Sequence, residues 1–314
     1  MRNKQKHFIF TILILFLMLV LCSCETEQTE DILIVYTNDV AGEVNGNIGY
    51  AGVKAFKDQL KAEHRYVSLV DAGDFFDGNY GRQNGGKDIL AVMNAAGYDV
   101  VAVGNQEFSI GLDALADNVN NASFPFVSCN LKYLGSGKNP LKKVKPYTIL
   151  RYGPTKIAFI GVTTPETLTP NKPAYEAITE GDELLYSFYE GNEGQDLYEQ
   201  VQKTVDKAKK KADYVIVLSH LGSNSVTEGF SSYDLIDHCT GIDVVIDAHS
   251  HTVIFGEGVY DAEGNDVVLT STGEKLEYVG LLSIHPDRTY TTVLYPNIEE
   301  RDPTVQGLVD SLFH

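Results

Sequence analysis

Short runs of apolar residues recur from residue 31 to the end of the chain, and most of them are rich in Val, Ile and Leu. Runs of this kind, bounded by Gly, Pro, Asn or Asp, predict β-strands. Several have almost no polar interruption, which is typical of strands in sheets that are covered on both faces. The predicted strands are 31–37, 66–71, 99–103, 126–129, 146–152, 156–162, 213–219, 243–247, 266–271, 277–284 and 290–294.

Between many of these strands the apolar positions change to a helical spacing. The predicted helices are 51–63, 87–96, 111–121, 195–212 and 231–238. Alternation of strands and helices indicates the α/β class. Residues 261–266 (DAEGND) have the composition of a hairpin turn within a strand-rich ending. The acidic segment 173–202, which lacks Lys and Arg, is open to two interpretations: a solvated loop followed by the start of helix 195–212, or a flap at the edge of a site.

Residues with metal-binding side chains follow the ends of several predicted strands. In open α/β sheets, ligands bind beyond the carboxyl ends of the strands, so these side chains are expected to converge. The candidate metal ligands are Asp39, Asp74, Asn105, His220, His249 and His251.

This mixture of carboxylate, amide and imidazole groups favours particular ions. Imidazole suits Zn, Fe and Mn, whereas carboxylate and amide oxygens suit harder ions. Two such ions held about 3.5–4 Å apart can clamp a phosphoryl oxygen and activate water, and a carboxylate is the natural bridge between them. The expected cofactors are therefore divalent Mn, Zn or Fe, one or two per chain.

Five ordered motifs carry a resemblance to a known family. They are TNDVAG (37–42), GDFFDG (73–78), GNQEFS (104–109), SHLG (219–222) and AHSHT (248–252). Over residues 31–297 the chain resembles the metallophosphoesterase domain of the 5′-nucleotidase / 2′,3′-cyclic phosphodiesterase family. The resemblance implies an α-β-β-α sandwich, in which two mixed sheets are flanked by helices.

The resemblance also implies a role for each candidate ligand. Asp74 would bridge two ions. Asp39 and His251 would serve one ion, and Asn105, His220 and His249 would complete the other.

The chain departs from the family pattern at three positions. Ala41 stands where the family has a His ligand of the first ion. Gln106 and Ser109 stand where the family has a His–Asp pair that stabilises or protonates the leaving oxygen. A glutamine donates a hydrogen bond but transfers no proton at neutral pH, and loss of a general acid typically costs a factor of about 10²–10⁴ in rate.

Two functions follow from this combination. The first is a metal-dependent phosphoester hydrolase with reduced or altered activity, in which Asn105 orients the phosphoryl group and Gln106 donates a hydrogen bond. Its substrate would be a small, nucleotide-like phosphate ester. The alternative is a catalytically inactive surface lipoprotein that binds a metal ion or a nucleotide.

The first residues predict export. Arg2, Lys4 and Lys6 precede an apolar run from Phe8 to Cys22, which is shorter than the ~20 residues of a spanning helix and suits a signal segment. The ending before Cys24 resembles a bacterial lipobox, so 1–23 is predicted as a lipoprotein signal peptide, Cys24 as the lipidated residue and 24–30 as a tether. A non-lipidated signal or an uncleaved anchor remains the alternative. The expected location is extracytoplasmic, at the bacterial cell membrane.

Composition adds three constraints. A formal net charge of −18 argues against a nucleic-acid polymer as partner, because a general basic surface is missing. Cys129 and Cys239, which lie outside the signal segment, form either one disulfide or two separate buried thiols. Residues 298–314 are predicted as a short tail, without the nucleotide-binding second domain of longer family members. The sequence leaves the oligomeric state undetermined.

Overall fold

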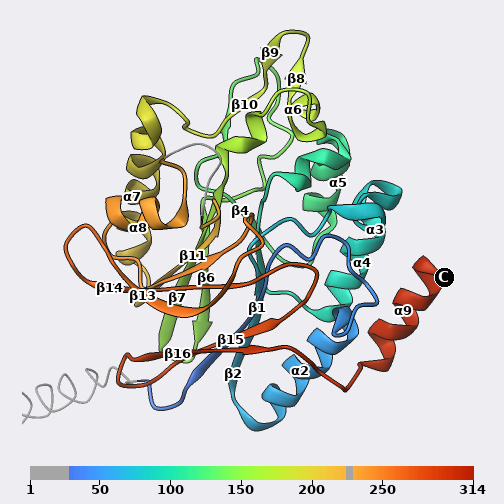
Figure 1. Cartoon of the computed structure of the whole chain (residues 1–314), viewed down its shortest axis with the longest axis vertical. Coiled ribbons are helices and arrows are strands. Elements are labelled where there is room, and N and C mark those ends of the chain that lie inside the picture. The colour runs from blue at the N-terminus through green and yellow to red at the C-terminus, as the bar shows by residue number, and fades with distance from the viewer. Residues whose placement is uncertain (1–27, 224–228) are drawn as a thin grey trace, which may run out of the picture.

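Two six-stranded mixed sheets pack face to face in the computed structural model, which describes residues 28–223 and 229–314 (Figure 1). The first sheet has the order β16-β15-β1-β2-β3-β4 and the second β13-β14-β12-β11-β7-β6. In the first sheet β1 to β4 are parallel, and β15 pairs antiparallel with β1. In the second, β7, β11, β12 and β14 are parallel, and β6 and β13 are antiparallel edge strands.

The first sheet consists of β1 (Ile32–Thr37), β2 (Tyr66–Asp71), β3 (Val100–Ala102), β4 (Phe126–Val127), β15 (Val279–Ile284) and β16 (Tyr290–Tyr295). The second consists of β6 (Tyr147–Tyr152), β7 (Thr155–Thr163), β11 (Tyr214–His220), β12 (Val244–Asp247), β13 (Val253–Tyr260) and β14 (Asp266–Thr272). Four short strands lie outside them: β5 (Lys132–Tyr133), β8 (Thr179–Glu180), β9 (Glu183–Leu184) and β10 (Tyr186–Ser187).

Helices cover the outer faces of both sheets. The α-helices are α2 (Gly49–Glu63), α3 (Gly78–Arg82), α4 (Lys87–Ala96), α5 (Leu112–Asn121), α6 (Pro173–Ala177), α7 (Gln195–Lys209), α8 (Ser232–His238) and α9 (Pro303–Phe313). The 3₁₀ helices are η1 (Gln83–Gly86), η2 (Gln106–Ile110), η3 (Pro165–Leu168) and η4 (Asn192–Gly194). Helices α2, α4 and α9 pack together over the first sheet, and α7 covers the second (Figure 1).

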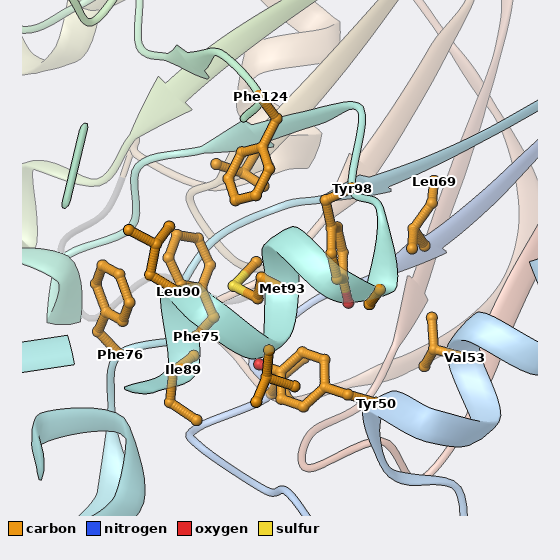
Figure 2. Packing of buried hydrophobic residues seen from close by; sticks show 14 of the residues in the cluster. Tyr50, Val53, Leu69, Phe75, Phe76, Ile89, Leu90, Met93, Tyr98 and Phe124 are labelled. Atoms are coloured by element: carbon orange, nitrogen blue, oxygen red, sulfur yellow. The ribbon is translucent and has the colours of Figure 1, made fainter. Parts of the chain in front are cut away.

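Alternation along the strands sorts the apolar side chains into three layers. In β1, Leu33 and Val35 face the helices, whereas Ile34 and Tyr36 face the other sheet. Successive strand residues point to opposite faces, so each central strand contributes to an outer and an inner layer. The outer layer under α2 and α4 is packed with aromatic and aliphatic side chains such as those of Figure 2. This is the α-β-β-α sandwich that the sequence resemblance implied.

Polar contacts also join the two sheets across the inner layer. The hydroxyl of Tyr36 in β1 lies 2.6 Å from that of Thr270 in β14, and both are buried. The hydroxyls of Ser68 in β2 and Tyr152 in β6 form a second buried pair at 2.6 Å. Buried hydroxyls that find each other across an apolar layer fix the relative position of the sheets.

Each predicted strand and helix corresponds to an element of the structure, with small shifts at the ends. The hairpin turn predicted at 261–266 joins β13 and β14, and the Asp261 carboxylate accepts backbone N–H groups of Glu263 and Asn265 within it. Segment 173–202 is more structured than a loop, because it contains α6, β8, β9, β10 and η4. Cys129 and Cys239 are buried free thiols, which settles the alternative of a disulfide between them.

The predicted signal segment and the lipidation residue Cys24 lie outside the described residues. Among the residues that are described, none of the helices has both the length and the apolar character needed to cross a bilayer.

Candidate metal centre

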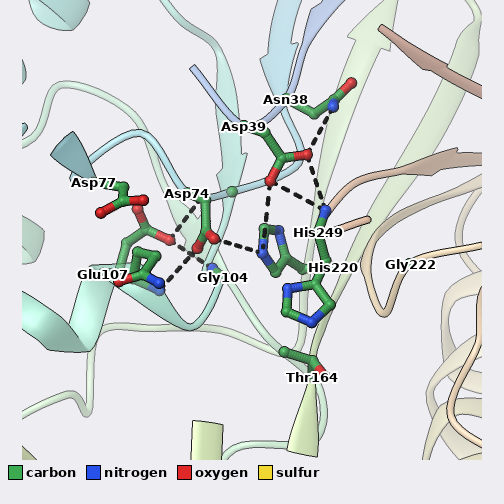
Figure 3. Close-up of polar contacts among 12 residues, drawn as sticks. Asn38, Asp39, Asp74, Asp77, Gly104, Glu107, Thr164, His220, Gly222 and His249 are labelled. Atoms are coloured by element: carbon green, nitrogen blue, oxygen red, sulfur yellow. Dashed lines mark hydrogen bonds and ion pairs between the residues drawn. The ribbon is translucent and has the colours of Figure 1, made fainter. Parts of the chain in front are cut away.

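The candidate ligands lie where the carboxyl ends of both sheets meet. Asp39 follows β1, Asp74 follows β2 and Asn105 follows β3, all in the first sheet. His220 ends β11, and His249 and His251 follow β12, in the second sheet. Figure 3 shows the side chains of Asp39 and Asp74 directed from one sheet toward His220 and His249 from the other.

The centre of the site is formed by Asp74, His220 and His249, each of which offers one ligand atom within 4.8 Å of the other two. Nε2 of His220 lies 3.0 Å from Oδ2 of Asp74 and 3.9 Å from Oδ1 of Asp39. Nε2 of His251 lies 3.8 Å from the same oxygen of Asp39, at the more exposed side of the site. Residues far apart in the sequence therefore converge.

The backbone at these ligands has an uncommon conformation. Asp39, Asp74, His249 and His251 all have positive φ, between 48° and 77°. A non-glycine residue in this region costs about 1–3 kcal/mol and persists where the surroundings fix it, most often at functional sites. Gly104 supports the same arrangement, because a Cβ there would collide with Oδ1 of Asp74.

Each histidine uses one ring nitrogen for a partner outside the cluster. Nδ1 of His220 lies 2.9 Å from the carbonyl oxygen of Ala72, so it carries the proton and leaves Nε2 for the cluster. Nε2 of His249 lies 2.8 Å from Oε2 of Glu166. A carboxylate accepts this hydrogen bond, so Nε2 is the donor and Nδ1 is the unprotonated nitrogen of the neutral ring.

His251 follows the same rule less tightly. Its Nδ1 lies 3.3 Å from Oε2 of Glu274, which leaves Nε2 toward Asp39. The ring is 46% exposed, whereas that of His220 is fully buried. Metal-binding histidines characteristically donate their second nitrogen to a carboxylate or a carbonyl, which orients the ring and fixes its tautomer.

The buried charges determine the protonation states of the cluster without an ion. Burial works against a charged His220, but Asp74 beside it raises the pKa of His220 to about 10. Burial also raises the pKa of Asp39, to about 8, although His220 opposes the shift. For Asp74, burial is outweighed by His220, which lowers the pKa of Asp74 below its usual range. One protonated imidazole is thus the positive charge between two buried carboxyl groups.

Glu107 holds the loop that carries Asp74. Its carboxylate accepts the backbone N–H groups of Asp74 and Gly104 at Oε2, at 2.9 and 2.7 Å, and that of Phe76 at Oε1, at 3.1 Å. It is fully buried, and burial followed by the nearby Asp74 raises the pKa of Glu107 to about 7. Glu107 is directed at the backbone, so its role is to fix the position of Asp74.

The donor set fits divalent metal ions. Oδ1 of Asn105 is buried without a hydrogen-bond partner within the described parts of the chain, and Nε2 of His220 faces the carboxylate of Asp74. Leaving a buried acceptor such as Oδ1 of Asn105 unsatisfied costs about 1–3 kcal/mol. A cation accepts both lone pairs, and it replaces the proton that His220 carries between the carboxylates. The residues present therefore match the metal that the family resemblance implies.

Gln106 and Asn105 adjoin this cluster. The backbone N–H of Gln106 donates to Oδ1 of Asp74 at 2.8 Å, and its side chain contacts Ser109. Asn105, Gln106, Ser109 and His249 line one pocket of about 350 Å³, which also reaches Pro173 and Ala174 of α6. The start of segment 173–202 therefore lies at the edge of the site.

Three residues that contact the candidate site residues could not be predicted from the sequence. Glu166 lies in the short helix η3 and Glu274 in the loop after β14, and nothing in their spacing ties them to the histidines. Arg82, which contacts Gln106, lies in the short helix α3 and carried no signal either. Glu107 had a signal, because it follows Asn105 by two residues inside a quoted motif.

Comparison with known proteins gives a family match over residues 67–276, to the family described as bacterial capsule synthesis protein PGA_cap. A snake venom 5′-nucleotidase from Gloydius brevicauda is 31% identical over 242 residues. The match covers 72% of this chain but 38% of the venom protein, so the chain spans about two fifths of the length of that relative.

Solved structures show the same architecture. The 5′-nucleotidase precursor from Thermus thermophilus superposes with a TM-score of 0.74 at 25% identity, over 90% of this chain and 58% of that one. The calcineurin-like phosphoesterase YfkN from Bacillus subtilis gives a TM-score of 0.71 at 23% identity, over 90% of this chain and 96% of that one. Because its identity is only 23%, the likeness to YfkN shows a shared fold alone.

Proposed function

Because the chain belongs to the family described as bacterial capsule synthesis protein PGA_cap, which it matches over 67–276, and is similar to metallophosphoesterases of the 5′-nucleotidase type, we propose that it hydrolyses small phosphate esters with the help of divalent metal ions. The observation that supports this most is the convergence of Asp74, His220 and His249, with Asp39 beside them. That arrangement offers oxygen and nitrogen donors at a pocket wide enough for a small ester.

We assign the ion ligands as Asp39, Asp74, Asn105, His220, His249 and His251. Divalent ions held there supply Lewis-acid activation of the phosphoryl group and of water. Glu107 keeps Asp74 in place, and Glu166 and Glu274 keep His249 and His251 oriented. Mn, Zn or Fe suit this mixture of imidazole and carboxylate groups.

Gln106 sets the limits of the chemistry. Its amide can donate a hydrogen bond to a substrate oxygen but cannot protonate a leaving group. Ala41 stands where the family has a histidine ligand, so the ion beside Asp39 would have one imidazole fewer. We therefore expect esters with acidic leaving groups, such as aryl phosphates or cyclic phosphodiesters, to be hydrolysed faster than ordinary monoesters of alcohols.

The direct test is a panel of phosphate esters assayed with the purified protein and added Mn²⁺ or Zn²⁺, with Asp74→Asn as the control. Turnover that depends on Asp74 and on added metal supports the proposal. No turnover above buffer on any ester would exclude the hydrolase and leave the second function, a metal- or nucleotide-binding pseudoenzyme, which Ala41, Gln106 and Ser109 favour. Metal analysis adds a separate readout, since two ions per chain support hydrolysis and one ion supports binding alone.

A triple variant, Ala41→His with Gln106→His and Ser109→Asp, restores the family residues at all three positions. If these substitutions account for a lower activity, the variant should gain about 10²-fold or more on alkyl monoesters, the size expected for one general acid. The same rates in the variant and the parent protein would show that the three positions do not limit the reaction.

We also propose that the protein is a lipid-anchored exported protein, because of the lipobox-like sequence before Cys24. Two acyl chains on one cysteine would give the stable anchoring that a single chain does not. Labelling of cells with a fatty-acid precursor should mark the parent protein and not Cys24→Ala; equal labelling of both would refute the anchor.

A further inference from the structure

The side chain of Gln106 is held in one orientation by two donors. Its Oε1 lies 3.0 Å from Nη2 of Arg82 and 2.8 Å from Oγ of Ser109. A guanidinium group only donates hydrogen bonds, so the atom that faces Arg82 must be the amide oxygen. The amide nitrogen Nε2 is therefore at the other end, and it has no hydrogen-bond partner among residues 28–223 and 229–314.

Two hydrogen bonds hold the guanidinium group of Arg82 beside Gln106. Its Nη2 donates to Oδ1 of Asp77 at 2.6 Å as well as to Gln106, which uses both protons of that nitrogen. Nη1 and Nε make no hydrogen bond with the part of the chain that is described. A planar guanidinium that is anchored through one nitrogen still presents its other donors as a fork for an anion.

These groups line the pocket beside the metal centre. Arg82, Gln106 and Ser109 share it with Asn105 and His249, and Lys172 contributes a second cation. The chain as a whole has a formal net charge of −18, so two basic side chains at one pocket stand out against an acidic background. Glu166 also lines the pocket, with Oε2 directed at Nε2 of His249.

We propose that Arg82 and the Gln106 amide form an anion subsite for the leaving group, which stabilises the leaving oxygen of a phosphate ester as it departs as an anion. This inference rests on the proposed hydrolase function. The P–O bond to a water oxygen forms while the P–O ester bond breaks, and the electron pair of that bond stays on the leaving oxygen. The proton lost by water passes to solvent, and the charge of Arg82 offsets the charge of the leaving oxygen.

A fixed charge at this position takes over the electrostatic part of a general acid and not the proton transfer. Preorganised donors aimed at developing charge are worth about 10²–10³ in rate for each donor. Such donors help most when the negative charge stays on the leaving oxygen and is not delocalised into the rest of the leaving group. Esters of less acidic phenols should therefore depend on Arg82 more than esters of strongly acidic phenols.

The test compares substituted phenyl phosphates that differ in the acidity of the phenol, with Mn²⁺ present. Arg82→Gln should lose about 10²-fold in kcat/KM on the least acidic phenol and less than about 10-fold on the most acidic. Arg151→Gln, at an exposed position of β6, is the matched control and should not alter how kcat/KM depends on the acidity of the phenol. An equal loss on all esters in Arg82→Gln would overturn the subsite, because a structural defect lowers all rates alike.

Ser109→Ala provides a second variant in case Arg82→Gln folds poorly. It frees the amide from one of its two donors, so we expect a shift of the same kind that is a few-fold in size. Ser109 is partly exposed and not in the core, so the substitution leaves the packing intact. If kcat/KM depends on the acidity of the phenol in Ser109→Ala as it does in the parent protein, this would count against a Gln106 amide held by Ser109.

Binding separates failure of the subsite from failure of the hydrolase. Inorganic phosphate is titrated calorimetrically into the Mn²⁺-loaded protein and its variants. If no ester is turned over, phosphate binding that weakens about 10-fold or more in Arg82→Gln, with Mn²⁺ affinity unchanged, retains the anion subsite. Phosphate binding that is the same in Arg82→Gln and Arg151→Gln overturns the subsite whether or not esters are turned over.

Discussion

Glu166 contributes to the metal centre through His249, although it belongs to none of the ligand motifs. Its carboxylate accepts the proton of Nε2, which leaves Nδ1 as the free nitrogen. Outer partners of this kind typically change metal affinity 10–100-fold. We predict that Glu166→Ala weakens Mn²⁺ binding by about 10–100-fold in calorimetric titration and that Glu166→Gln, which retains an acceptor oxygen, weakens it less.

Glu176→Gln, on the exposed side of α6, is the control for this change. It should bind Mn²⁺ like the parent protein. Parent-like Mn²⁺ affinity in Glu166→Ala would show that His249 keeps its orientation without this carboxylate.

Glu107 provides the second prediction at this scale, because one carboxylate satisfies three buried backbone donors. Gln offers one oxygen and directs an NH₂ group at an N–H donor. An unsatisfied buried donor costs about 1–3 kcal/mol, so Glu107→Gln should lower the free energy of unfolding by that amount. Urea unfolding followed by circular dichroism measures it, and a loss below about 0.5 kcal/mol would contradict this role.

The six candidate ligands could be named from the sequence because each belongs to a short motif after an apolar run. Their partners could not. Glu166 and Glu274 reach the histidines from short irregular segments whose sequence has no periodicity, and contact with His249 depends on how η3 packs. Arg82 contacts Gln106 across 24 residues of sequence, which is a tertiary contact that local pattern does not encode.

At the scale of elements, the central strands were predictable because buried parallel strands are almost wholly apolar. β13 was missed for the opposite reason. It is an exposed edge strand with Gly256, Glu257 and Gly258 in its middle, and its pairing with β14 shifts register there. Edge strands with glycines and charges have no clear pattern in sequence, because they are stabilised by one neighbour and by solvent-facing side chains.

Helix α9 gives a prediction at this scale. The Asp302 carboxylate accepts the N–H of Val305 at 2.8 Å and caps the helix, and Val305, Val309 and Phe313 are buried where α9 packs against α2 and α4. Loss of an N-cap typically costs about 1 kcal/mol. Asp302→Ala should therefore lower the free energy of unfolding by about 1 kcal/mol in urea titration.

Asp310→Ala on the exposed face of the same helix is the matched control and should change stability by less than about 0.5 kcal/mol. Equal losses in the two variants would mean that the cap of α9 does not stabilise the domain.

Across the whole molecule, Asp243 joins the two sheets. Its carboxylate accepts the N–H of Val215 in the second sheet at 2.7 Å and the hydroxyl proton of Tyr290 in the first sheet at 3.0 Å. Burial raises the pKa of Asp243 above its usual value of 3.8. The folded protein therefore binds this proton more tightly than the unfolded chain, and the stability that the proton contributes is lost as pH rises through the raised pKa.

We predict that the free energy of unfolding of the parent protein, minus that of Asp243→Asn, is largest near the ordinary pKa of an aspartate, about pH 4, and decreases as pH rises. A pKa that rises by one unit on folding changes this difference by about 1.4 kcal/mol. Urea unfolding of both proteins at several pH values measures it. A difference that is constant or grows with pH would show that Asp243 keeps its ordinary pKa in the fold.

Metal binding gives a prediction for the molecule as a whole. An ion that binds the folded chain and not the unfolded chain stabilises it by about 2.7 kcal/mol at one hundred times its dissociation constant. Mn²⁺ should therefore raise the Tm in a concentration-dependent way, and Asp74→Asn should remove most of the rise. A Tm that does not respond to Mn²⁺, Zn²⁺ or Fe²⁺ would refute the proposed centre.

The site lies across the seam between the sheets, and this bears on when an ion can be captured as the chain folds. The first sheet alone carries Asp39, Asp74 and Asn105, which are all oxygen donors, and the imidazoles arrive with β11 and β12. A partly synthesised or half-folded chain thus lacks the complete set of ion ligands. Loading must follow docking of the second sheet, so ion uptake is a late event that marks a finished molecule.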